Sequence, residues 1–185
     1  MLRVLGLFRR DRRERVAYGL YCRAVETARD PVLYSQFGVP DTLDGRFDLV
    51  SLHVYLLIRR LGIAGAAGPA LSQGVFDAMF NDMDLNLREM GAGDLSVGKR
   101  VRAMWEGFHG RSIAYQIALD AADQPALAAA LTRNVWRREA AADASAQGLA
   151  RYVCEQDRFL REQDDAMLTA GHVDFLAPAT TLEPA

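Results

Sequence analysis

The sequence predicts an all-α protein that forms a single compact domain of about six to seven helices. Apolar residues recur at helical spacing along nearly the whole chain. Strict alternation of apolar and polar residues never lasts, and β-branched residues are sparse. Half of the 185 residues are hydrophobic and a quarter are charged, which is typical of a globular protein with a core of its own.

The first third of the chain predicts two helices followed by an ordered loop. Apolar residues at helical spacing place the first helix over 11–29. The Asp-Pro step at 30–31 supplies an N-cap and a proline at the first helical position, and so opens a short helix that ends at Gly38. The loop covers 39–46, because Pro40 favours an extended conformation before it and an Asp-Gly pair favours a turn.

Two longer helices follow in the middle of the chain. Residues 47–61 are apolar on nearly every side, so this helix is expected at the centre of the core. Gly62 supplies its C-terminal cap. Residues 72–90 carry an apolar stripe that includes several methionines, and Gly91 ends the helix.

The last third of the chain predicts three more helices. One begins at Asp94 or Ser96 and runs to about Ala121. The next two cover 124–138 and 143–169. No internal repeat, hairpin of strands or domain boundary interrupts this pattern.

The chain divides into three parts by charge and pattern. Residues 1–15 form a basic amphipathic arm with a net charge of +4, which leaves −6 for the rest of the chain. Residues 16–172 form the helical domain, and residues 173–185 are expected to be a disordered tail. A basic arm on an acidic body favours contact with an anionic surface, such as lipid headgroups or RNA phosphates. A solvated helix start explains the same charges.

The arm could lie on a membrane surface through one apolar side. Leu2, Leu5 and Phe8 fall on that side, and Arg9 and Arg10 follow as cations that could reach the headgroups. No run in the chain approaches the roughly 18 apolar residues that cross a bilayer. The weak net charge of −2 gives no reason to expect a sequence-specific nucleic-acid protein.

An acidic segment raises the question of a metal site. Asp82, Asp84 and Asn86 stand at the first, third and fifth positions of a calcium loop. Such a loop needs glycine at position six and a bidentate carboxylate at position twelve, where this chain has Leu87 and Gly93. We therefore predict no metal here, and a helix on which Asp82, Asn86 and the later Glu89 share one charged face.

An arginine interrupts the apolar stripe of the helix after this segment. Arg111 occupies the one missing step of that stripe, where a buried cation needs a carboxylate partner. The candidate partners are Asp44, Asp82 and Asp84. A structural ion pair and a partner-binding role both remain open.

No enzyme is predicted. Glu106 and His109 form a Glu-x-x-His pair of the kind that di-iron bundles use, but the second copy is absent. His53 lies within an apolar helix and is expected to be a core residue. No phosphate-binding loop or nucleophile motif occurs, so no catalytic residue and no cofactor are predicted.

Three long motifs carry a family resemblance, over 18–134. They are VPDTLDGRFDLVSLHVYLLIRRL, LSQGVFDAMFNDMDLNLREMGAGDLSVGKRV and GRSIAYQIAL. The chain resembles the ubiquinol–cytochrome c chaperone family, in a bacterial form. The resemblance implies a non-enzymatic assembly chaperone that binds newly made cytochrome b, supports biogenesis of respiratory complex III and acts near the ribosome. It also implies a cytoplasmic protein that associates peripherally with the bacterial inner membrane.

The resemblance also indicates residues for partner binding, in two charged motifs and one buried arginine. These are Pro40, Asp41, Gly45 and Arg46, then Asp82, Asp84, Arg88, Glu89, Asp94 and Lys99, and finally Arg111. The alternative function is a membrane-surface or RNA-associated helical adaptor that holds no client.

Overall fold

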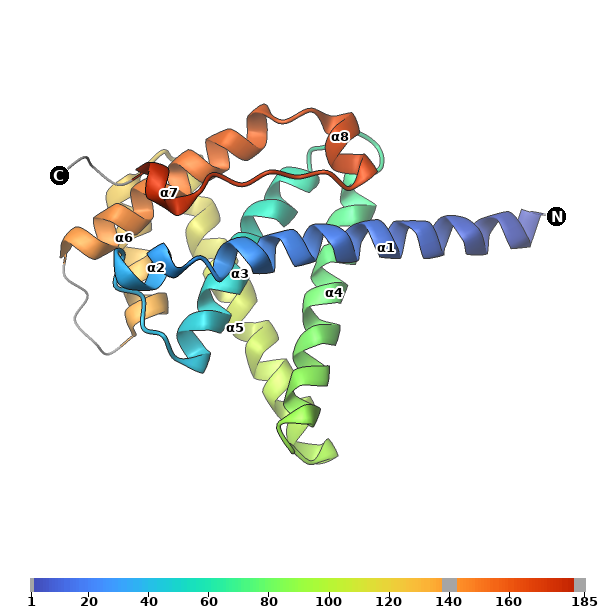
Figure 1. Cartoon of the computed structure of the whole chain (residues 1–185), viewed down its shortest axis with the longest axis horizontal. Coiled ribbons are helices and arrows are strands. Elements are labelled where there is room, and N and C mark those ends of the chain that lie inside the picture. The colour runs from blue at the N-terminus through green and yellow to red at the C-terminus, as the bar shows by residue number, and fades with distance from the viewer. Residues whose placement is uncertain (1, 138–142, 182–185) are drawn as a thin grey trace.

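The computed structural model of the protein describes the backbone of residues 2–137 and 143–181. It describes the side chains of the same residues except 2–11, 95 and 143. All regular structure in these ranges is helical, so the predicted all-α class is confirmed. Within the described ranges, the α-helices are six long ones and two short ones (Figure 1). They are α1 (Leu2–Ala28), α2 (Pro31–Ser35), α3 (Leu43–Leu61), α4 (Gly68–Glu89), α5 (Asp94–Asp120), α6 (Gln124–Leu131), α7 (Asp143–Glu162) and α8 (Asp165–Ala170).

Helix α3 lies at the centre of the molecule, as its apolar composition predicts. It contacts α1, α4, α5 and α7, and its apolar residues from Leu49 to Leu57 are buried. The helix begins at Leu43, four residues earlier than expected, because the Thr42 hydroxyl caps it by accepting a hydrogen bond from the Gly45 N–H at 3.1 Å. The Asp-Gly pair assigned to a turn therefore belongs to the first turn of this helix.

Helices α1, α4 and α5 extend beyond this centre in two directions. The N-terminal end of α1 projects past the other helices, and the α4–α5 hairpin projects from another side (Figure 1). Helices α1 and α4 cross closely, because Gly74 carries no side chain at the crossing. A Cβ at that position would lie 2.7 Å from the Cβ of Ala17.

The helix expected over 124–138 changes its winding before it ends. Helix α6 stops at Leu131, and a π-helical segment follows over Thr132–Trp136. Arg137 then adopts a φ of 54° and ends the segment. Residue 138, the expected end, lies outside the described residues.

The helix expected over 143–169 is broken into α7 and α8. Arg60 of α3 donates hydrogen bonds to the carbonyl oxygens of Leu160 and Gln163, at 2.7 and 2.6 Å, and so satisfies the end of α7. The Asp164 carboxylate then caps α8 by accepting hydrogen bonds from two backbone N–H groups. The break depends on Arg60, which is about a hundred residues away in sequence.

The first nine residues of the tail that was expected to be disordered, 173–181, have a defined conformation in the structure. Residues 173–181 lie along α7, and a 3-10 turn forms over Pro178–Thr181. The Gln163 side chain forms hydrogen bonds with both backbone groups of Asp174, and the Gln156 side-chain oxygen Oε1 accepts a hydrogen bond from the N–H of Leu176. Because Gln156 of α7 and Gln163 directly after it supply these polar partners, the segment is held in place; residues 182–185 lie outside the described residues.

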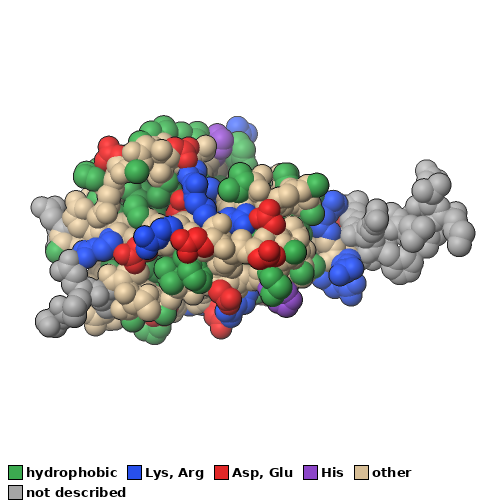
Figure 2. All heavy atoms as spheres, turned by 90° about the horizontal axis from the view of Figure 1, so that it is seen from above, with side chains coloured by type: hydrophobic (Ala, Val, Ile, Leu, Met, Phe, Trp, Pro, Cys, Tyr) green, Lys and Arg blue, Asp and Glu red, His purple; other side chains and the backbone are tan. Residues whose placement is uncertain are grey.

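The charges of the described surface are mixed. On the face seen when the view of Figure 1 is turned to look from above, acidic and basic side chains are intermingled and neither sign forms an extended patch (Figure 2). The apolar and basic side chains assigned to the arm, Leu2, Leu5, Phe8, Arg9 and Arg10, lie outside the described side chains. In the described part of the chain, no helix combines the length and the apolarity that crossing a bilayer requires.

Candidate functional site: an apolar groove between α1, α3 and α4

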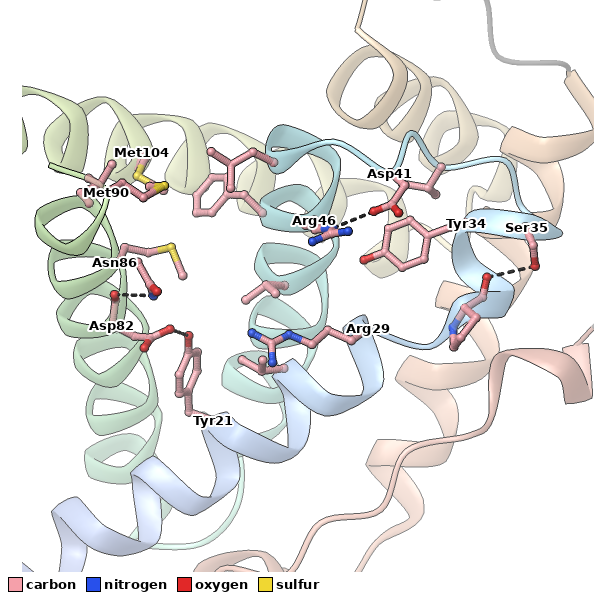
Figure 3. Close-up of a pocket in the computed structure, with 18 residues that line it drawn as sticks. Tyr21, Arg29, Tyr34, Ser35, Asp41, Arg46, Asp82, Asn86, Met90 and Met104 are labelled. Carbon is pink, nitrogen blue, oxygen red and sulfur yellow. Dashed lines mark hydrogen bonds and ion pairs between the residues drawn. The ribbon is translucent and has the colours of Figure 1, made fainter. Parts of the chain in front are cut away.

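A groove with a volume of about 830 Å³ opens between α1, α2, the following loop, α3 and α4, and Met104 of α5 closes one end (Figure 3). Its walls are mostly apolar. They are formed by Val25, Val39, Leu43, Phe47, Val50, Met83, Leu87, Met90 and Met104. Three methionines lie among them, and methionine side chains adapt their shape to varied apolar partners.

A tyrosine and a carboxylate join α1 to α4 at the wall of the groove. The Tyr21 hydroxyl donates a hydrogen bond to Asp82 at 2.7 Å. Burial raises the pKa of Tyr21 well above its usual value, and the bond to Asp82 adds to the rise, so the phenol stays protonated and remains a donor. Asp82, which the sequence analysis placed on an exposed charged face, is half-buried and lines the groove.

The opposite wall of the groove carries an ion pair and a further cation. Arg46 of α3 and Asp41 of the loop form an exposed pair at 2.6 Å. The hydrogen bond from Arg46 lowers the pKa of Asp41. Arg29 at the end of α1 is exposed and forms no ion pair within the described ranges. Polar groups of both signs therefore stand at the edges of an apolar depression.

Two of the expected binding residues have a structural role in the loop beside the groove. The Pro40 carbonyl approaches Gly45 so closely that a Cβ on Gly45 would lie 2.0 Å from its oxygen. No other residue type fits there without movement of the backbone. Pro40 and Gly45 therefore fix the loop that presents Asp41 to the groove.

The remaining charged motif lies at the projecting end of the α4–α5 hairpin, outside the groove lining. Arg88 pairs with Asp84 at 2.6 Å and with Asp94 at 2.5 Å, and so connects α4 to α5 across the turn. Glu89 and Lys99 are exposed nearby in sequence. Among the described side chains, no cluster of three or more His, Cys, Asp or Glu residues is arranged to hold a metal.

Arg111 is not part of the groove lining and pairs with a carboxylate that the sequence analysis missed. Its guanidinium is 2.6 Å from Asp48 of α3, whose side chain is 1% exposed, and it lies over the ring of Phe47, 5.7 Å from the centroid. The prediction that Asp44, Asp82 or Asp84 pairs with Arg111 is wrong. Asp44 pairs with Arg137, Asp82 accepts a hydrogen bond from Tyr21, and Asp84 pairs with Arg88. The Nη1 atom of Arg111 forms this ion pair but makes no hydrogen bond, because its N–H groups are not aligned with the carboxylate.

Asp48 is held by two arginines in a buried position. Arg137 approaches its second carboxylate oxygen at 3.2 Å. Burial raises the pKa of Asp48 to about 6, and the attraction of Arg111 and Arg137 limits the rise. Asp48 was missed because it lies in a run of apolar residues that gives no sign of a charged partner.

His53 is a core residue, as expected. Its ring is fully buried, with Nδ1 2.8 Å from the Leu49 carbonyl oxygen and Nε2 2.8 Å from the Tyr152 hydroxyl. Burial lowers the pKa of His53 to about 4, so the ring is neutral at physiological pH. It does not reach the groove.

Most of the apolar lining was not predicted as a binding site, and the groove residues that sequence reasoning missed include Tyr21, Arg29, Tyr34, Met90 and Met104. Met90 gave one usable signal, because it closes the methionine-containing stripe of α4. Tyr21, Arg29 and Tyr34 come from elements whose relative placement only the fold determines.

The described residues thus form a helical protein with an apolar groove whose edges are polar. The chain belongs to the ubiquinol-cytochrome C chaperone family, whose model matches residues 35–175. This match extends beyond the motifs found in the sequence analysis and includes α7 and α8.

Three known proteins are similar to the chain along most of its length. The chain is 28% identical to a ubiquinol-cytochrome-c reductase complex assembly factor 1 from Xenopus laevis, over 83% of this chain and 77% of that protein. The human protein of that name is 25% identical and covers 83% of this chain, which spans about half (52%) of its length. The crystal structure of the Cbp3 homolog from Brucella abortus superposes with a TM-score of 0.83 at 40% identity, covering 95% of this chain and 98% of that one.

Proposed function

We propose that this protein is an assembly chaperone that binds newly made cytochrome b and supports biogenesis of the ubiquinol–cytochrome c reductase complex. The observation that carries the proposal is the apolar groove between α1, α3 and α4 in a member of this chaperone family. The names of the vertebrate relatives, which are complex assembly factors, support it. The protein acts by binding and carries out no reaction of its own.

The groove suits a client that is an apolar helix. A newly made membrane subunit exposes apolar helices before its cofactors and neighbouring subunits pack against them. An apolar wall of adaptable methionines covers such a helix, while the polar edges around Asp41, Arg46 and Asp82 keep the complex in contact with water. The charged hairpin end around Arg88 forms an additional rim for the client.

The basic arm places the chaperone near its client. Residues 2–15 form the start of α1, which projects beyond the body, and the net charge of +4 over 1–15 is attracted to anionic headgroups. We expect peripheral attachment at the bacterial inner membrane, close to ribosomes that make cytochrome b. Removal of residues 1–15 releases the protein from anionic vesicles in this account.

The alternative, a membrane-surface or RNA-associated adaptor without a client, uses the same arm. This alternative predicts that the arm alone accounts for binding to the membrane or to RNA, and that the protein functions without a client in the groove. Binding to RNA phosphates weakens steeply with added salt, whereas apolar insertion into lipid does not. An unchanged level of the assembled reductase complex after gene deletion would favour this alternative.

Two exposed residues near the C-terminal end of α4 allow a matched test of the groove. Met90, the C-cap of α4, lines the groove and is 56% exposed, whereas Leu85 within the helix is 55% exposed and does not line it. A strain that lacks the gene is complemented with Met90→Glu or with Leu85→Glu. We expect loss of assembled reductase complex with Met90→Glu only, and an unchanged level of other respiratory complexes. Equal complementation by both variants would reject the groove as the client site.

A further inference from the structure

The outer face of α5 carries an apolar ridge that the proposed function does not use. Trp105, His109, Ile113 and Ile117 follow one another at intervals of four residues. Trp105 and Ile113 are each 46% exposed, and Ile117 is 66% exposed. The rings of Trp105 and His109 stack in parallel, with centroids 5.5 Å apart. The ridge is about 18 Å long, at a rise of 1.5 Å per residue.

The ridge points away from the groove. Met104 of the same helix lines the groove, and Ile113 follows it by nine residues. Nine residues correspond to about two and a half turns, so the two side chains lie on opposite sides of the helix. A partner on the ridge therefore leaves the client groove open.

Two opposite charges of α5 flank the ridge symmetrically about position 111. Arg102 precedes this centre by nine residues, and Asp120, the last residue of α5, follows it by nine. When a second copy of α5 lies antiparallel on the first, Arg102 of one chain faces Asp120 of the other, and the two-fold axis repeats the pair. An antiparallel copy thus brings opposite charges together, whereas a parallel copy brings like charges together.

The apolar residues obey the same symmetry. Trp105 of one chain faces Ile117 of its partner, and His109 faces Ile113. Such self-complementarity is what a two-fold interface requires, because each contact occurs twice. Within one chain Arg102 pairs with Glu106 and Asp120 pairs with Arg59, so the new contacts extend existing exposed pairs into networks.

We infer that the protein forms a two-fold symmetric dimer through antiparallel contact of the α5 ridges. The occupant of this face is a second copy of the same chain. An interface formed by one pair of helices is small, so we expect a dimer with a Kd of about 1–100 μM.

Sedimentation of the purified full chain at increasing concentration tests the dimer. We expect a monomer–dimer equilibrium that Ile113→Glu weakens about a hundredfold, because the substitution places a carboxylate from each chain in an apolar contact. Ile63→Glu is the matched control, since Ile63 is 67% exposed but lies on the turn after α3. A monomer at the highest soluble concentration, or equal weakening by the control, overturns the inference.

Cysteine pairing tests the orientation. Trp105→Cys and Ile117→Cys are prepared separately in a Cys22→Ser background, because Cys22 is exposed. We expect the mixture to form a disulfide-linked dimer faster than either variant alone. Faster linkage of each variant with itself would indicate a different register and contradict the antiparallel contact. Neither outcome bears on the client groove, because the groove variants are tested by the amount of assembled reductase complex.

Discussion

Replacement of Arg111 separates a structural role for this residue from a partner-binding role. Its guanidinium lies 2.6 Å from the buried carboxylate of Asp48, and its side chain is only 16% exposed. Arg111→Met removes the cation and retains most of the side-chain volume. The substitution leaves Asp48 with one arginine, the more distant Arg137 at 3.2 Å.

The cost follows from the burial of Asp48. Removal of one partner from a buried ion pair typically costs 3–5 kcal/mol, because a charge is left uncompensated, and the remaining arginine places the expected loss at about 3 kcal/mol. For a chain of this size, that loss lowers the Tm by about 6–12 °C. The double variant Asp48→Asn/Arg111→Met carries no unpaired buried charge, so we expect it to recover about half of the loss.

The assay is urea unfolding at pH 7.5 and again at pH 5. Loss of Arg111 raises the pKa of Asp48 further, so the destabilisation is present above that pKa and is relieved as the pH falls and the carboxyl takes up a proton. The loss should therefore be smaller at pH 5. A loss below about 1 kcal/mol at pH 7.5 would refute the structural role, as would a double variant no more stable than Arg111→Met.

Three further predictions concern the folded body. Gly45→Ala destabilises by about 3 kcal/mol or more, because the new Cβ meets a loop carbonyl oxygen at 2.0 Å; urea unfolding measures the loss. Gly74→Ala lowers the free energy of unfolding by about 1–3 kcal/mol, because the new Cβ pushes α4 away from Ala17 of α1. Gly19→Ala raises it by about 1 kcal/mol, because the space around Gly19 is open. The pKa of His53 is lowered to about 4, so the unfolded chain takes up a proton first as the pH falls below 6.5. From pH 7 to pH 5 the natural chain therefore loses about 2 kcal/mol more stability than His53→Asn, as pH-dependent unfolding can show.

The regular parts of the fold were predictable because they depend on local patterns. The central position of α3 follows from its apolar composition, and α5 begins at Asp94 as one of the two predicted starts. The end of α7 was missed, because Arg60 satisfies its last carbonyl groups from another helix. The ordered segment over 173–181 was missed for the same reason, since its hydrogen-bond partners are Gln156 of α7 and Gln163 directly after that helix.

The candidate site was predictable in part. The charged motifs were found, but they separate in space: Asp41, Arg46 and Asp82 reach the groove, whereas Arg88 connects the hairpin. Arg111 was correctly expected to need a carboxylate. The identity of that carboxylate depends on how α3 and α5 cross, and a single sequence does not contain that information.

The most direct test of the account is a crosslink between the groove and the client in living cells. A photoreactive amino acid is placed at Met90 in the groove and, in a second strain, at Leu85 on the other side of α4. We expect position 90 to crosslink to newly made cytochrome b and position 85 not to crosslink to it. Equal crosslinking from both positions, or none from position 90, would contradict it.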